Sequence, residues 1–161
     1  MKLSCNQMIK TINKFPALED AETQNWIISF VDRSISGTEL PEALEELTVI
    51  DYSAFKGCEQ LALASLPKKT TRIENYAFEQ CFNLAITSIP EPVTDIGFMA
   101  FGYCTNLTSI TFEGTPKNIN SSAFSSCTNL TTINVPWAEG EVAGAPWGAT
   151  NATINYNYTG G

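Results

Sequence analysis

The chain has 161 residues, 43% of them hydrophobic, which is enough for one domain with a substantial buried core. Its 9 basic and 17 acidic residues give a net charge of −8, which argues against a nucleic-acid backbone or an anionic membrane as the partner. No stretch approaches the roughly 18 apolar residues of a membrane-crossing helix, so we expect no membrane insertion.

Residues 1–49 are predicted to form an N-terminal cap. Apolar residues recur there at about helical spacing: Met8, Ile9, Ile12 and Phe15. A strand-like segment, WIISFV, follows from Trp26. Polar residues interrupt the first 15 positions, so no secretion signal is visible and the location of the protein stays open. Cys5 lies in this segment and has no predicted role.

Residues 50–136 contain four repeats of 23 residues without an insertion. The repeats read IDYSAFKGCEQL from Ile50, IENYAFEQCFNL from Ile73, IGFMAFGYCTNL from Ile96 and INSSAFSSCTNL from Ile119. In register they give columns of identical residues: Ala54, Ala77, Ala100 and Ala123; Phe55, Phe78, Phe101 and Phe124; Cys58, Cys81, Cys104 and Cys127; Leu61, Leu84, Leu107 and Leu130. This period predicts stacked coils that share one core.

Each repeat is expected to supply one strand to a shared sheet. Leu107-Thr-Ser-Ile-Thr-Phe112 and its counterpart from Leu130 show the Leu-x-x-Leu-x-Leu spacing of leucine-rich repeats. The alternation of apolar and small polar residues is typical of a strand with one solvated face. Proline ends the strand in three repeats, at Pro67, Pro90 and Pro136, and Glu113-Gly114 stands there in the other. The predicted fold is a leucine-rich-repeat solenoid, mainly β, with short helical or 3-10 segments.

Residues 137–161 are predicted to form a degenerate closing coil and a C-terminal cap. The segment APWGATNATINYNY places Trp147 one period after Phe124, in the position of the repeated phenylalanine. The Phe column itself is interpreted as core and not as a stacking platform for bases or sugars, because it stays in register with the Ala and Leu columns.

The Cys column is interpreted as structural. A zinc site calls for histidines or Cys-x-x-Cys pairs, and the chain has neither. Coils roughly 4.8 Å apart lie within disulfide range, but parallel side chains on stacked coils do not point at each other. We therefore predict buried thiols, with a disulfide or a metal as the alternatives.

No catalytic, cofactor-binding or metal residues are predicted, and we expect a protein that is not an enzyme and needs no cofactor. Nucleophilic and acid–base catalysis commonly use histidine, which is absent, and no glycine-rich phosphate loop is present. The pairs Lys68–Lys69 and Glu45–Glu46 are interpreted as surface charge. Five glycosylation-like motifs, at Asn106, Asn120, Asn129, Asn151 and Asn157, are interpreted as turn and strand residues.

The motif AF-x-x-C-x-x-L, repeated as AFKGCEQL, AFEQCFNL, AFGYCTNL and AFSSCTNL, resembles the BspA-like leucine-rich-repeat family over roughly residues 27–156. The resemblance implies a bacterial or prophage-encoded interaction protein, adhesin-like, on a cell surface or a phage particle. The leading hypothesis is a non-catalytic module that binds a protein or glycan, and oligomers are possible. The alternatives are a structural or tail-associated phage component and, remotely, a hydrolase that uses acidic residues.

A partner is predicted to dock on the outward side of the strands. With Ile110 and Phe112 inward, the outward columns hold Ser109, Thr132, Leu63 and Ile86, and Thr111, Asn134, Ser65 and Ser88. Leu63 and Ile86 break the polar pattern. Either a bulge turns both into the core, or they form a small exposed apolar docking patch.

Overall fold

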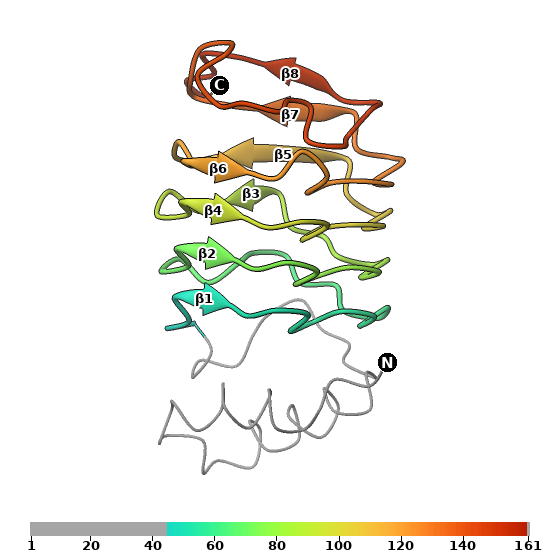
Figure 1. The fold of residues 1–161 in the computed structure, drawn as a ribbon. Helices are drawn as coiled ribbons and strands as arrows, with labels where there is room; N and C mark the ends of the chain where they lie inside the picture. The colour runs from blue at the N-terminus through green and yellow to red at the C-terminus, as the bar shows by residue number, and fades with distance from the viewer. Residues whose placement is uncertain (1–44, 161) are drawn as a thin grey trace.

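The computed structural model describes residues 45–160, which form a stack of coils running from β1 to β8 (Figure 1). The predicted N-terminal helix, the strand from Trp26 and Cys5 lie outside these residues. The register between neighbouring coils is 23 residues, as in the pairing of Ile73 with Ile96. The predicted leucine-rich-repeat solenoid is therefore confirmed.

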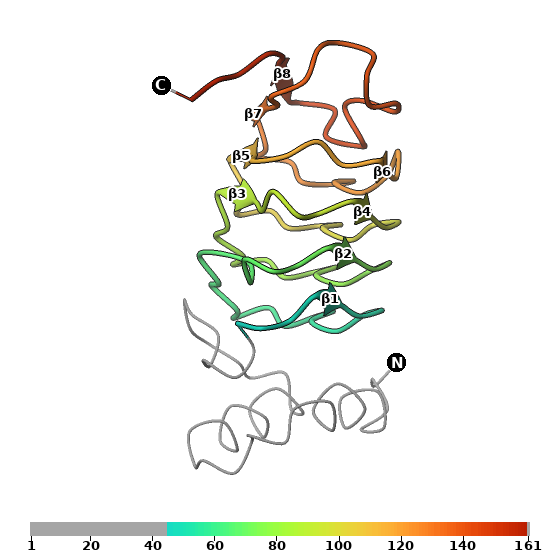
Figure 2. The same cartoon turned by 90° about the vertical axis from the view of Figure 1, so that its left-hand side faces the viewer.

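The coils form two parallel sheets of four strands each, where one shared sheet was predicted. The first sheet has the order β1 (Val49–Ile50), β2 (Arg72–Ile73), β4 (Asp95–Ile96) and β6 (Asn118–Ile119). The second has the order β3 (Ser88–Ile89), β5 (Ser109–Phe112), β7 (Thr132–Asn134) and β8 (Thr153–Asn155). Figure 2 shows them on opposite sides of the molecule. The sheet that was not predicted is the first one, and it arises because the Ile column is extended as well and pairs from coil to coil.

The Ala-Phe-x-x-Cys segment forms a third side made of turns. Within residues 45–160 there is no α-helix or 3-10 helix, so that part of the prediction is wrong. The N–H groups of Ala54 and Cys58 bond within the coil, to carbonyls three residues back, but those of Phe55 and Gly57 donate to the next coil at 2.7 Å. A helix would keep all these bonds inside one coil. Positive φ angles allow the alternation, for example 73° at Gly57.

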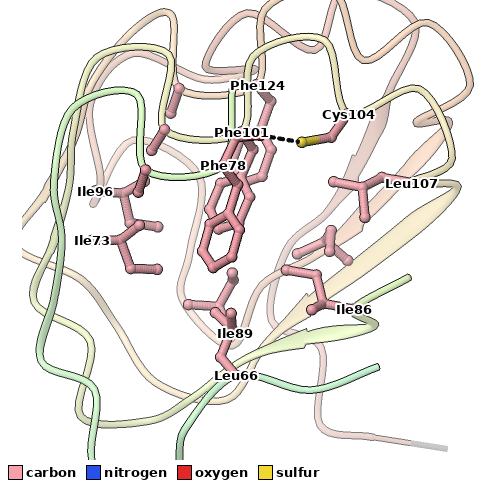
Figure 3. Packing of buried hydrophobic residues seen from close by; sticks show 14 of the residues in the cluster. Leu66, Ile73, Phe78, Ile86, Ile89, Ile96, Phe101, Cys104, Leu107 and Phe124 are labelled. Carbon is pink, nitrogen blue, oxygen red and sulfur yellow. Dashed lines mark hydrogen bonds between the residues drawn. The ribbon is translucent and has the colours of Figure 1, made fainter. Parts of the chain in front are cut away.

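The core is a bundle of columns that run along the stack. Neighbouring Phe rings stack with centroids 5.0, 5.5 and 5.1 Å apart and planes within 5° of parallel (Figure 3). The repeated Ile, Cys and Leu residues of the four repeats are also buried. The interpretation of the Phe column as core is confirmed, since Phe78, Phe101 and Phe124 have no exposed surface.

The last coil is shorter than the others. β8 pairs with β7 in a register of 21 residues, with Thr132 opposite Thr153. Trp147 is fully buried and its carbonyl accepts the Phe124 N–H at 2.9 Å, as Ala123 does for Phe101. Its ring packs against Phe112 and Trp137 at the end of the core. The domain boundaries 1–49, 50–136 and 137–161 stay a prediction.

Asparagine side chains support the turns between coils. Asn129 Nδ2 donates to the Thr105 carbonyl at 2.8 Å, and Asn151 Nδ2 donates to the Thr128 carbonyl at 3.0 Å. Both bonds reach back to the preceding coil. This agrees with the interpretation of these motifs as turn residues.

Candidate interaction surface

The predicted apolar docking patch does not exist. Leu63 and Ile86 are only 1% and 2% exposed, so the exposed-patch hypothesis is wrong and the bulge alternative is confirmed. In the first two repeats the inward residues follow the spacing of Leu61, Leu63 and Leu66; in the next two they follow that of Leu107, Ile110 and Phe112.

The cause is an extra outward residue that changes place between repeats. It follows Leu63 and Ile86 in the first pair of repeats and precedes Ile110 in the third. Ala64 and Thr87, which stand where Ile110 stands, are exposed. The number of residues from the first to the last inward residue is the same in all four repeats, so the coil keeps its length.

The other predicted docking residues lie on the outer side of the second sheet, except Ser65, which precedes β3 and holds the Ser88 position in the first repeat. Ser65 is exposed, and the remaining members are partly exposed: Ser88, Ser109, Thr111, Thr132 and Asn134. They bond along the stack, because Asn134 Nδ2 donates to Thr111 Oγ1 at 3.1 Å and Ser88 Oγ donates to Glu113 Oε1 at 2.7 Å. Part of the hydrogen-bonding capacity of these side chains is therefore already used within the chain and is not free for a partner. Their role in binding stays a prediction.

Three aromatic side chains on the turn side form a second candidate surface. We define the aromatic column as Tyr52, Tyr76 and Phe98, which lie on three successive coils. Their rings meet edge to face, with centroids 5.7 Å apart between Tyr52 and Tyr76 and 5.4 Å apart between Tyr76 and Phe98. Tyr52 is 44% exposed and Phe98 is 37% exposed, whereas Tyr76 between them is partly buried.

The repeat positions of the three residues explain why the Tyr76 ring is offset from the rings of Tyr52 and Phe98. Tyr52 and Phe98 occupy the same position, three residues before the buried Phe, and Tyr76 stands one position later in its coil. Asn75 takes the Tyr52 position in that coil, where its Oδ1 accepts the Phe98 N–H at 2.7 Å. The middle ring is therefore offset from its two neighbours and contacts both.

One cation lies beside the aromatic column. Lys56 Nζ is 4.9 Å from the centroid of the Tyr76 ring and forms an ion pair with Glu79. A cation over an aromatic face is attracted by the ring quadrupole. Because Glu79 is buried, this ion pair holds Lys56 in place against the Tyr76 ring, at one side of the aromatic column.

The sequence reading missed the aromatic column because it followed only the identical columns. The available signal was an additional aromatic residue just before Ala-Phe in each of the first three repeats, in DYSAF, NYAF and GFMAF. Whether such rings face solvent depends on the turn conformation, which the period alone does not give.

The cysteine thiols have a structural role. The Sγ atoms of Cys81, Cys104 and Cys127 donate to Phe carbonyls of the preceding coil at 3.0, 3.1 and 3.0 Å (Figure 3 for Cys104). All four repeat cysteines are buried thiols, which confirms that prediction. Burial raises the pKa of Cys127 to about 12 and holds the pKa of Cys104 well above its usual range. Such thiols are poor nucleophiles near neutral pH.

The described part of the chain contains neither a metal-binding cluster nor a membrane-spanning helix. Within residues 45–160 no group of three His, Cys, Asp or Glu side chains could hold a metal ion. The same residues include no helix that is long and apolar enough to span a bilayer. Lys69 and Glu46 pair with each other at 2.5 Å on the surface, with 61% of each side chain exposed, as expected for surface charge.

Stacked 23-residue coils with parallel strands and a column of leucines define the class as a leucine-rich-repeat solenoid. The sequence matches the BspA type leucine rich repeat region in six copies over residues 28–142. The chain therefore belongs to the BspA-type leucine-rich-repeat family, which suggests a protein-interaction module. No curated protein and no solved structure matches the chain.

Proposed function

We propose that this chain is a non-catalytic, adhesin-like module that binds a protein partner through the aromatic column. The observation that carries the proposal is the exposure of Tyr52 and Phe98, with Tyr76 joining them across three coils. Tyr and Phe are enriched at protein interfaces, where large rigid rings bury area at low entropic cost. Exposed apolar patches of this kind mark interaction sites.

The rest of the turn side supplies a rigid support for these rings. Inter-coil bonds from Tyr76 N–H to Phe98 O and from Phe78 N–H to Ala100 O, at 2.9 and 2.7 Å, fix the spacing of the coils. A partner therefore meets a preorganised row of rings and loses little free energy in ordering them. The outward Ser, Thr and Asn residues of the second sheet, which we call the polar face, are the alternative site for the partner.

The experiment selects random peptides displayed on phage against the full chain and measures their affinities for variants. The double variant Tyr52→Ser, Phe98→Ser should weaken the selected peptides about tenfold or more, since each exposed ring supplies contact area. The matched control, Ser109→Ala with Thr132→Ala, removes two hydroxyls from the polar face and should leave affinity unchanged. Both variants must keep the wild-type melting temperature.

Two outcomes would overturn the proposal. If the selected peptides bind the Tyr52→Ser, Phe98→Ser variant with unchanged affinity but bind the Ser109→Ala, Thr132→Ala variant more weakly, the binding site lies on the second sheet. Failure to select any peptide, together with binding of the same protein to a printed glycan array, would replace the protein partner by a glycan.

A further inference from the structure

The outer side of β8 is open in the described part of the chain. β8 ends the order β3-β5-β7-β8, and Figure 1 shows it at the C-terminal end of the stack. Thr153 N–H donates to Thr131 O at 2.9 Å, and Asn155 O accepts the Val135 N–H at 3.0 Å. Because the backbone groups of successive strand residues point to opposite sides, the N–H and C=O of Ile154 point away from β7.

This edge lacks the usual protection against pairing. Natural edge strands carry charges, proline or bulges that keep other strands away. β8 reads Thr-Ile-Asn, and the segment from Val142 to Gly160 contains no charged residue. The edge therefore presents unpaired backbone groups in an uncharged setting.

The core is also incompletely covered at this end. Ile154 and Tyr156 pack against the core but keep part of their surface exposed, and so does Ala152. Their counterparts one coil inside, Ile133 and Val135, have no exposed surface. Another layer of structure on β8 would complete the burial.

We propose that this edge pairs with β8 of a second copy of the chain, so that the second sheet continues across a two-fold axis. Two identical edges related by such an axis run antiparallel, and the contact closes at two copies. The absence of charge from Val142 to Gly160 lets two identical ends meet without direct repulsion. Each whole chain carries a charge of −8, so association should strengthen as salt screens the repulsion.

Sedimentation equilibrium of the full chain tests the proposal. The wild type should pass reversibly from the 17.6 kDa chain mass to twice that mass as its concentration rises. Ile154→Pro removes the outward N–H but leaves the bonds to β7, so it should weaken the dimer about tenfold or more. Thr153→Lys places like charges beside each other at the interface and should have a similar effect.

The matched control is Thr132→Lys, because Thr132 pairs with Thr153 in the same column one strand inside the sheet. It adds the same charge and should not change the dimer. A wild type that stays at 17.6 kDa at every concentration and salt would overturn the proposal. A dimer that survives both β8 substitutions would overturn it too, and Thr153→Lys decides alone if Ile154→Pro does not fold.

Discussion

Replacing Phe101 by Ala should remove about 3–5 kcal/mol from the free energy of unfolding. Phe101 has no exposed surface and stacks between Phe78 and Phe124, at 5.5 and 5.1 Å. These neighbours cannot close the gap, because the bonds from Phe78 N–H to Ala100 O and from Phe101 N–H to Ala123 O fix the coil spacing. The cavity therefore persists, which puts the cost near the upper end of the range.

A loss of that size is a large part of the 5–15 kcal/mol that is typical of a domain. Urea denaturation followed by circular dichroism measures it, and both proteins must show a single cooperative transition. The matched control is Phe98→Ala, three positions earlier in the same coil, where the ring is 37% exposed and the cost should stay below about 1 kcal/mol. Equal losses for the two variants would refute the assignment of Phe101 to a rigid core.

The buried thiols give two further predictions. Cys104 and Cys127 should not react with a thiol reagent at pH 8 in the native protein and should react at once in denaturant; prompt native labelling would contradict their burial. The folded pKa of Cys127, about 12, lies above the ordinary value of 9.0, so the stability it confers is complete below pH 9 and declines above it. Above pH 9 the free energy of unfolding of the wild type, measured by urea titration, should fall by up to about 1.4 kcal/mol per pH unit relative to that of Cys127→Ser. If the two proteins show the same dependence of this free energy on pH, the prediction is contradicted.

The identical columns could be predicted from the sequence because stacking puts equal residues in equal environments. Phe55 and Phe124 are inward for the same reason, and Cys81, Cys104 and Cys127 take small buried positions beside a Phe carbonyl. The 23-residue period is enough to predict these positions. The period does not determine the backbone of the turn side, since either helical turns or alternating turns can direct Ala and Phe inward.

Which residues lie on the predicted docking face depends on where the extra outward residue stands in each repeat. In LALASL the only large residues are Leu61, Leu63 and Leu66, so the chain bends to bury all three, and the small Ala64 is left outside. In LTSITF the large residue between Leu107 and Phe112 is Ile110, and the bend precedes it. Side-chain size therefore decides the choice, although strict alternation counted back from the inward Leu66 would have exposed Leu63.

The two proposed surfaces lie at opposite ends of the described stack. The position of Tyr52 holds Tyr, Asn, Phe and Ser in the four repeats, whereas the position of the buried Phe never varies, so the fold does not require an aromatic residue there. The aromatic column covers the first three repeats and ends at Ser121, while β8 lies beyond the fourth. Pairing through β8 would thus leave both columns open at the far ends of a dimer. Such a dimer would engage two copies of a partner at once, and its avidity would exceed the affinity of one column without any new contact.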